Sequence, residues 1–570
     1  MMCLRMRHSG SSLRLSDVLA RHIAPAALVA LAAFVVGAAL GAAHVPAERE
    51  VAQRYLEAWQ RGDHATMHGL LTPEARRAVG PQQFQTAVRG AASTATATGL
   101  EFDDLELADG TVSASAAVPT RVFGDLALEL RLAVEEVDGE QRIAWRGHNA
   151  FPGLRPGESL SRDTRLPERA ALLARDGTRL AAGPLRTSEL GAAAAPVVGG
   201  LGAIPPERAA RLRALGWPDD AQVGVSGLER AFDERVAGRP GGELLAGDRV
   251  LASARPQPGE AVRTSVSVAV QQAAVEALAG RLGGIVALDP ATGEVLASSG
   301  IGLEGLQPPG STFKVITLAG ALEAGITGTG RRYEPMTSAT LEGVELQNAN
   351  GALCGGTLLE TFAESCNSVY APMGAQLGAQ RLVEAAEDFG FNAPPGVDGA
   401  AVSTLPPADE IGDDLAVGAS AIGQGRVQAT ALQMALVSAV VAREGVLPQA
   451  SFVVGGSGVE GERTIPAEVA RTVERLMVAV VEEGTGTAAA IPGVRVAGKT
   501  GTAELRATQG QCPPVCGSDP TATSAWFLAH APAEDPEVAV ATLLVQGGSG
   551  GETAAPAAAA VLRAALRRPD

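Results

Sequence analysis

Hydrophobic and polar positions follow different periods in successive parts of this 570-residue chain. Apolar side chains at helical spacing over 47–59 predict an amphipathic helix, and shorter helical patterns follow at 65–71 and 81–88. From about residue 99 the period changes to two, with Asp-Gly turns at 109–110 and 138–139, which predicts strands joined by turns. The block 46–151 is therefore expected to be a small α+β domain.

The rest of the chain divides into two regions. Residues 152–258 are rich in Gly, Pro and Arg, and a strand-turn signal at 169–177 favours a folded domain over the alternative, an irregular linker. Residues 259–570 are expected to form one large domain. Its predicted elements are a helix at 268–282, strands at 284–289, 295–297 and 538–545, and a closing Ala-rich helix at 554–568.

An apolar run at 23–45 carries no Asp, Glu, Lys or Arg and is long enough to cross a bilayer about 30 Å thick. Four arginines precede it, so the positive-inside rule predicts a cytoplasmic tail at 1–22 and an extracytoplasmic remainder. A cleaved signal peptide is the alternative, but the run is longer than the apolar core of most such peptides. We therefore expect a single-pass anchor in the plasma membrane.

The net charge of −17 and the absence of a basic stripe argue against nucleic-acid binding. Four of the five cysteines follow the apolar run as two close pairs, Cys354 with Cys366 and Cys512 with Cys516. In an extracytoplasmic compartment we expect disulfides, with free buried thiols as the alternative. A metal site lacks histidines at ligand spacing, so neither a metal nor a cofactor is expected.

Lysine occurs only twice among the 46 basic residues, at Lys314 and Lys499. Arginine keeps its proton in proteins, whereas a desolvated lysine can release it and act as a base. Segment 308–314 reads Pro-Pro-Gly-Ser-Thr-Phe-Lys, which starts a predicted helix and puts Ser311 and Lys314 on one face. Because a serine hydroxyl becomes a good nucleophile only when a base takes its proton, this pair is the predicted centre of an active site.

Two further motifs follow in order. Ser365-Cys366-Asn367 reads S-x-N within a predicted helix-loop, and residues 499–502 read Lys-Thr-Gly-Thr at the end of a predicted strand. The set S-x-x-K, S-x-N and K-T-G resembles the active sites of penicillin-binding proteins and serine β-lactamases. With its anchor and two additional domains, the chain is similar to a class B (monofunctional) penicillin-binding protein.

The resemblance implies the remaining architecture. Region 46–151 is similar to the nuclear-transport-factor-like domain of methicillin-resistance-type members, region 152–258 to the pedestal or dimerisation domain, and region 259–570 to the transpeptidase domain. The last would be an antiparallel sheet flanked by helices, so the fold class is multidomain α+β. Two departures, a short segment at 299–308 and Arg-Thr-Ser-Val-Ser at 263–267, would reshape the edge of the cleft without touching a catalytic residue.

The resemblance also assigns roles. It implies catalytic roles for Ser311, Lys314, Ser365, Asn367 and Lys499, substrate binding by Thr500, Gly501 and Thr502, and an oxyanion hole made by the backbone N–H groups of Ser311 and Thr502. A cleft-edge strand bearing this motif binds an extended peptide through its main chain. A disulfide between the first two paired cysteines would pin the S-x-N loop beside the site.

The implied activity is a serine D,D-transpeptidase that cross-links peptidoglycan stem peptides and is acylated by β-lactams. A polytopic membrane glycosyltransferase is the implied partner. A D,D-carboxypeptidase, a β-lactam sensor and a non-catalytic cell-wall scaffold are the alternatives. A class A β-lactamase would need a glutamate four residues before an asparagine between S-x-N and K-T-G. The residue four before Asn392 is instead Asp388.

Overall fold

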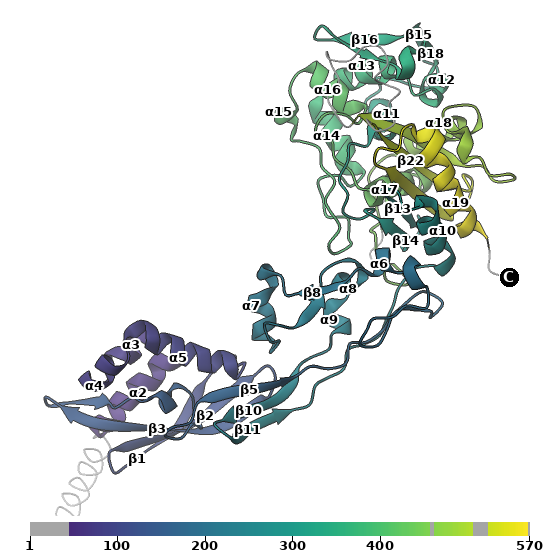
Figure 1. The fold of residues 1–570 in the computed structure, drawn as a ribbon. Helices are drawn as coiled ribbons and strands as arrows, with labels where there is room; N and C mark the ends of the chain where they lie inside the picture. Colours follow the sequence, from purple (N-terminus) through teal and green to yellow (C-terminus); the bar gives the residue numbers. More distant parts are fainter. Residues whose placement is uncertain (1–44, 457–460, 505–522, 568–570) are drawn as a thin grey trace, which may run out of the picture. The chain divides into compact units, whose positions relative to one another are not determined.

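The computed structural model describes residues 45–456, 461–504 and 523–567, which form two compact units (Figure 1). The smaller unit contains the described residues up to Leu166 with Arg211–Trp217 and Pro240–Arg255, and the larger unit contains the rest. Apart from Val45, the predicted anchor lies outside the described residues. Among the helices that are described, none is both long and apolar enough to cross a membrane.

The smaller unit has helices packed on an antiparallel sheet (Figure 1). Its helical patterns form α2 (Ala47–Gln60), α3 (His64–Gly69) and α5 (Pro81–Thr94), with the additional short helix α4 (Pro73–Ala78). The sheet has the order β1-β2-β3-β4, and its turns include Asp109 and Asp138, both with positive φ. Its strands and those of a second sheet, β11-β10-β5, are β1 (Glu101–Ala108), β2 (Thr111–Thr120), β3 (Gly124–Val137), β4 (Glu140–Ile143), β5 (Leu160–Arg165), β10 (Gly241–Ala246) and β11 (Arg249–Ala254).

The alternation of apolar and polar residues in the smaller unit matches the alternation of buried and exposed positions in its longest strands, β2 and β3. Inward positions of β2, such as Val112 and Val118, are buried while alternate positions are partly or fully exposed. These residues pack with Tyr55, Trp59 and Phe84 from the helices in one core. The predicted α+β character of this region therefore follows from two amphipathic patterns that bury their apolar faces against each other.

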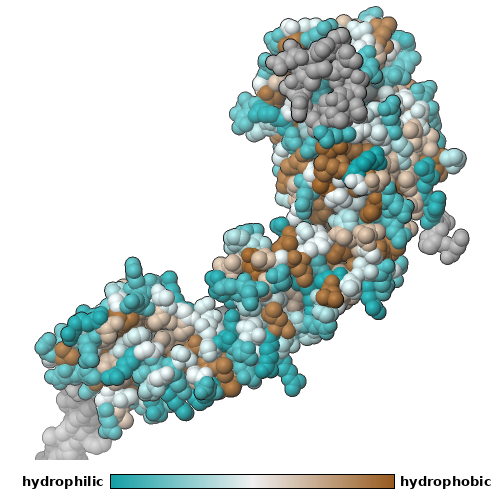
Figure 2. All heavy atoms as spheres, viewed as in Figure 1, coloured by the Kyte–Doolittle hydropathy of each residue, from teal (hydrophilic) through white to brown (hydrophobic). Residues whose placement is uncertain are grey.

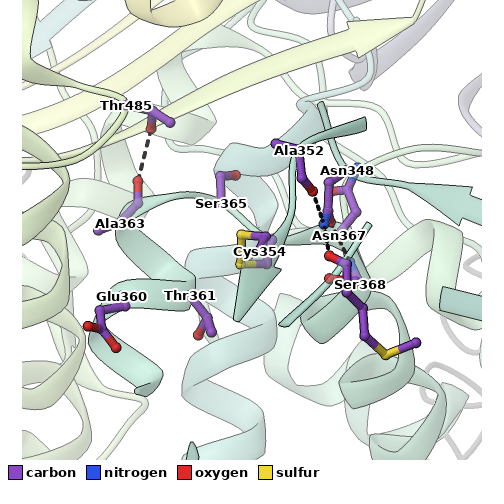
Figure 3. Close-up of a disulfide and its surroundings, with 12 residues drawn as sticks. Asn348, Ala352, Cys354, Glu360, Thr361, Ala363, Ser365, Asn367, Ser368 and Thr485 are labelled. Carbon is purple, nitrogen blue, oxygen red and sulfur yellow. Dashed lines mark hydrogen bonds between the residues drawn. A yellow bond between two sulfur atoms is a disulfide. The ribbon is translucent and has the colours of Figure 1, made fainter. Parts of the chain in front are cut away.

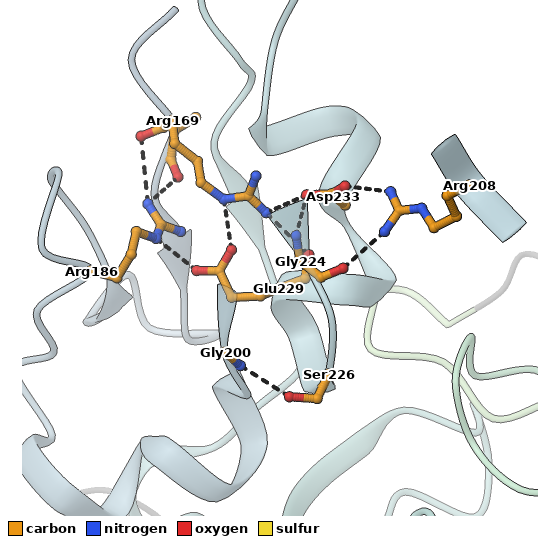
Figure 4. Close-up of polar contacts among 9 residues, drawn as sticks. Arg169, Arg186, Gly200, Arg208, Gly224, Ser226, Glu229 and Asp233 are labelled. Carbon is orange, nitrogen blue, oxygen red and sulfur yellow. Dashed lines mark hydrogen bonds and ion pairs between the residues drawn. The ribbon is translucent and has the colours of Figure 1, made fainter. Parts of the chain in front are cut away.

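The larger unit begins with short elements joined by a buried ionic network (Figure 4). Glu229 accepts hydrogen bonds from Arg169 Nε (2.8 Å) and Arg186 Nε (2.6 Å), and its side chain is 1% exposed. Asp233 accepts from Arg169, Arg208 and the backbone N–H of Gly224. The elements here are β6 (Leu172–Leu173), β7 (Arg179–Ala181), η2 (Gly191–Ala193), α6 (Ala195–Val198), β8 (Leu201–Ala203), α7 (Pro206–Ala214), β9 (Gln222–Gly224), α8 (Gly227–Ala231), α9 (Asp233–Val236) and β12 (Val262–Arg263).

A five-stranded antiparallel sheet with the order β14-β13-β23-β22-β21 forms the middle of the larger unit. Its strands are β13 (Gly283–Leu288), β14 (Val295–Gly300), β21 (Ala497–Glu504), β22 (Thr523–Ala531) and β23 (Val538–Leu544). Helices α10 (Val268–Leu278) and α19 (Ala555–Leu566) pack on one face, and α17 (Ala431–Ala442) packs on the other (Figure 1). Along β22, Trp526 and Leu528 belong to the core on the α17 side, whereas Phe527 belongs to the core on the α10 side.

Further helices and hairpins complete the larger unit around this sheet. They are η3 (Gly310–Phe313), α11 (Lys314–Glu323), β15 (Arg332–Met336), β16 (Ser338–Leu341), β17 (Val344–Gln347), η4 (Ala349–Gly351), β18 (Cys354–Thr357), α12 (Leu358–Ala363), α13 (Asn367–Leu377), α14 (Ala379–Asp388), α15 (Ala408–Ile411), α16 (Asp414–Ala421), β19 (Val446–Leu447), β20 (Glu462–Arg463), α18 (Ala467–Glu482), η5 (Thr487–Ala489) and η8 (Gly550–Ala554). The helix predicted at 268–282 ends at Leu278, because Ala279 takes a left-handed conformation with φ 50°. Figure 2 shows hydrophobic side chains interspersed with polar ones on the visible surface.

Candidate active site

The nucleophile motif lies in a turn packed tightly against the K-T-G strand. Ser311 belongs to η3, and Lys314 is the first residue of α11. Gly310 has φ +54°, and a Cβ there would lie 2.6 Å from the carbonyl oxygen of Thr502. A Cβ at Gly501 would in turn lie 2.8 Å from the carbonyl oxygen of Pro309. The two glycines therefore allow a backbone approach that any side chain would block.

The Lys314 side-chain nitrogen lies within hydrogen-bond distance of three oxygen atoms of the S-x-N motif. Its Nζ lies 2.8 Å from the Ser365 carbonyl oxygen, 3.2 Å from Ser365 Oγ and 2.7 Å from Asn367 Oδ1. It also lies over the ring of Tyr370, 5.6 Å from the centroid. The first two predicted motifs therefore meet through one buried side chain.

Lys499 reaches the same serine from the opposite direction. Its Nζ donates to Ser365 Oγ at 2.9 Å, and it lies on β21 on the sheet face that α17 covers, where Lys499 pairs with Leu528 of β22. Ser365 thus accepts hydrogen bonds from both lysines of the chain. The structure brings together the three motifs that the sequence had only in linear order.

Both lysines are fully buried, and this determines their protonation. Burial and then the charge of Lys499 hold the pKa of Lys314 well below its usual value. Burial lowers the pKa of Lys499 to about 7. A buried amine without its proton can accept one from a serine hydroxyl, whereas a protonated neighbour stabilises negative charge. The lowered pKa values therefore favour Lys314 as the base and Lys499 as the neighbouring cation.

The loop bearing Ser365 has a constrained backbone. Ser365 has φ 61°, an uncommon conformation for a residue with a side chain, and it lies between α12 and α13. A disulfide joins its neighbour Cys366 to Cys354 of β18 (Figure 3). The second predicted cysteine pair, Cys512 with Cys516, lies outside the described residues.

Asn348 supports this loop, although no motif in the sequence pointed to this residue. Its Oδ1 accepts from the backbone N–H of Ser368 (2.8 Å), and its Nδ2 donates to the carbonyl oxygens of Met336 (2.7 Å) and Ala352 (2.9 Å), as Figure 3 shows in part. Asn367 also donates from Nδ2 to the Gln347 carbonyl oxygen at 2.8 Å. The start of α13 is therefore held by β17 and the residues after it.

Trp526 and Gly423 also position the nucleophile turn. Trp526 is fully buried, and its Nε1 donates to the carbonyl oxygen of Pro308 at 2.8 Å. The backbone N–H of Gly310 donates to the carbonyl oxygen of Gly423 at 2.9 Å. A Cβ at Gly423 would lie 2.0 Å from the Gly310 carbonyl oxygen, so the Gly-Gln-Gly turn at 423–425 needs a glycine at its first position.

Thr500 and Thr502 lie two residues apart on β21 and so project on the same side of that strand. Thr500 is buried, and its Oγ1 lies 2.6 Å from Oγ1 of Thr485, while Thr502 is exposed. In the part of the chain that the structure describes, no group of three or more His, Cys, Asp or Glu residues could hold a metal ion. Because Ser365 Oγ contacts both buried lysines, the arrangement is suited to moving a proton to or from a serine hydroxyl.

Two family models match the chain: the penicillin binding protein transpeptidase domain at residues 283–563 and the penicillin-binding protein dimerisation domain at residues 149–264. The peptidoglycan D,D-transpeptidase PbpA of Mycolicibacterium smegmatis is 35% identical over 413 residues, covering 60% of this chain and 80% of that relative. The chain belongs to the penicillin-binding protein transpeptidase family. The family predicted from the three motifs is thereby confirmed.

Other members of the family support the same assignment. The D,D-transpeptidase MrdA of Acinetobacter baumannii is 27% identical over 397 residues, covering 58% of this chain and 59% of that relative. Penicillin-binding protein A from M. tuberculosis, solved as an imipenem acyl-enzyme complex, has a TM-score of 0.56 and 28% identity, covering 70% of this chain and 99% of that one. The predicted α+β transpeptidase and dimerisation domains fit these matches.

Proposed function

We propose that this chain is a serine D,D-transpeptidase that cross-links peptidoglycan stem peptides and is acylated by β-lactams. The observation that supports it most directly is the meeting of both buried lysines at Ser365 Oγ, beside the turn that carries Ser311. Relatives named D,D-transpeptidases and a β-lactam acyl-enzyme structure support the same reaction.

In the proposed reaction Ser311 Oγ attacks the carbonyl carbon of the penultimate D-Ala while Lys314 takes the hydroxyl proton. The backbone N–H groups of Ser311 and Thr502 hold the oxyanion of the tetrahedral intermediate. Ser365 gives its hydroxyl proton to the nitrogen of the departing D-Ala and takes the proton held by Lys314, and the bond between the two D-Ala residues breaks. An amine from a neighbouring stem peptide then attacks the ester, and Ser311 recovers its proton as the new amide forms.

Binding of the stem peptide is proposed to use β21. Lys499, Thr500 and Thr502 would hold the terminal carboxylate, Gly501 would let the substrate backbone approach, and Asn367 would orient the substrate amide. The exposure of Thr502 beside the buried Thr500 and Lys499 supports this proposal, because a substrate could reach that end of the motif from solvent.

We extend the proposal to the parts of the chain outside the site. The apolar run at 23–45 would anchor the protein in the plasma membrane, with residues 1–22 in the cytoplasm. Residues 46–151 would form a nuclear-transport-factor-like domain, 152–258 the pedestal, and 259–570 the extracytoplasmic catalytic domain. A polytopic membrane glycosyltransferase that supplies the glycan strands would be its partner.

The test is intact mass spectrometry of the full chain in detergent, after incubation with benzylpenicillin and followed over hours. We expect an adduct of the mass of the drug that persists and maps to the peptide containing Ser311, and none in Ser311→Ala. An adduct that clears within seconds, or one on another residue, would contradict the proposal. A folded wild-type protein without any adduct would instead favour a non-catalytic scaffold.

A D,D-carboxypeptidase is the second candidate, since it would use the same residues with water as the acceptor. A D-Ala-D-Ala thioester assay with and without an amine acceptor separates the two. Transpeptidation requires the amine to divert the acyl-enzyme into an amide product. Release of free acid alone, at every amine concentration, would favour the carboxypeptidase.

A further inference from the structure

Thr485 connects the K-T-G strand with the segment that leads to Ser365. It follows α18, and its backbone N–H donates to the carbonyl oxygen of Ala363 at 3.1 Å. Its Oγ1 donates to the same oxygen at 3.2 Å and lies 2.6 Å from Oγ1 of Thr500. Figure 3 shows Thr485 directed toward Ala363, two residues before Ser365. One side chain therefore links the K-T-G motif to a residue two positions before the S-x-N motif.

Close backbone packing fixes the position of this threonine. A Cβ at the preceding Gly484 would lie 2.5 Å from the Ala363 carbonyl oxygen. A Cβ at Gly551 would lie 2.4 Å from the carbonyl oxygen of Thr485 itself. Two glycines thus allow the backbones on both sides of Thr485 to approach it, so the contact is built into the fold rather than made by a freely moving side chain.

Counting protons assigns a direction to these hydrogen bonds. A hydroxyl has one proton to donate, and a carbonyl oxygen can only accept. When Thr485 donates to the Ala363 carbonyl, the hydroxyl proton in the 2.6 Å contact must therefore come from Thr500. In that state Thr500 has only lone pairs left to offer, which a substrate carboxylate would repel.

We propose that Thr485 is a positioning residue whose hydroxyl reverses its donor direction when a substrate carboxylate binds. The Thr500 hydroxyl then donates its hydrogen bond to the carboxylate, and the Thr485 hydroxyl donates a hydrogen bond to Thr500 Oγ1. The Ala363 carbonyl keeps the backbone N–H of Thr485 as its donor. Recognition of the C-terminal carboxylate is thereby coupled to the segment before Ser365. The inference rests on the proposed function, because it requires a carboxylate at the K-T-G strand.

The test compares two ligands that differ only in that charge. The second-order rate constant for acylation of Ser311 is measured with benzylpenicillin and with its methyl ester, and their ratio gives the carboxylate preference. We expect Thr485→Val to lower this ratio about three- to tenfold, the size of one neutral hydrogen bond. Thr485→Ser, which keeps the hydroxyl, should stay within about twofold of wild type. Thr487→Val, an exposed threonine two residues on, serves as the matched control and should leave the ratio unchanged.

A double-mutant cycle checks the coupling. Thr500→Val should lower the carboxylate preference, and adding Thr485→Val to it should lower the ratio no further, because the two hydroxyls act through one contact. If Thr485→Val slows both ligands equally, or if the two losses multiply, the inference is wrong and Thr485 only supports the fold. Failure of the proposed function would look different: folded wild-type protein would form no Ser311 adduct with either ligand.

Discussion

Replacing Lys499 with glutamine should shift the pH dependence of acylation to higher pH. Lys314 and Lys499 both lie within hydrogen-bond distance of Ser365 Oγ, at 3.2 and 2.9 Å. Their Nζ atoms are therefore at most about 6 Å apart, a separation at which two unit charges repel by about 3 kcal/mol at an effective dielectric constant near 20.

The direction of the pH shift follows from the protonation state of Lys314 that the charge on Lys499 disfavours. The positive charge on Lys499 opposes protonation of Lys314 and so lowers its pKa, after the larger effect of burial. Without that charge the pKa of Lys314 rises, and a higher pH is needed to generate the free base. Because the acidic limb of the acylation profile reports the base of the free enzyme, we expect this limb to move to higher pH in Lys499→Gln.

The assay is the second-order rate constant for penicillin acylation between about pH 5 and pH 10, the range that spans lysine pKa values in such sites. Loss of substrate contacts by Lys499 lowers the rate at every pH, so the position of the limb is the readout and not its height. Lys499→Arg keeps the charge and is the control, with a limb close to that of wild type. The reasoning is refuted if the glutamine and arginine variants have the same limb position.

Two further predictions concern stability. Cys354→Ser opens a covalent loop with a sequence separation of 12, and the chain-entropy relation predicts a loss of stability of about 3 kcal/mol. Thermal unfolding should show this loss, and penicillin acylation should slow because Cys366 adjoins Ser365. If reductant leaves the thermal stability of the wild-type protein unchanged, this prediction is wrong. Glu229→Gln removes the carboxylate that pairs with the nearly buried Arg169 and Arg186, of which Arg169 keeps Asp233, and should destabilise by about 3–5 kcal/mol in denaturant unfolding. Glu129→Gln in the exposed pair with Arg131 should change stability by less than about 1 kcal/mol, and equal effects of the two glutamines would contradict the argument.

Sequence patterns predicted the smaller unit's α+β character and the strands of the central sheet because local amphipathic periods report which face of an element is buried. Helix α4 was missed, since six residues are too short for a period to emerge. The end of α10 was also missed, because a left-handed alanine at 279 carries none of the usual glycine signal for a helix terminus. Each of the two compact units consists of several segments that alternate along the chain, so a division into consecutive residue ranges does not describe them.

The type of chemistry could be predicted from the amino-acid sequence. Two lysines in a chain that otherwise uses arginine, each in a motif with a hydroxyl residue, were enough to predict a serine acyl-transfer enzyme. How these groups act on one another depends on the folded chain. Burial of both amines, their common contact with Ser365, and the support from Asn348, Thr485 and Trp526 arise between segments up to 218 residues apart. Protonation depends on desolvation and on distances between charges, and neither quantity exists until the chain has folded.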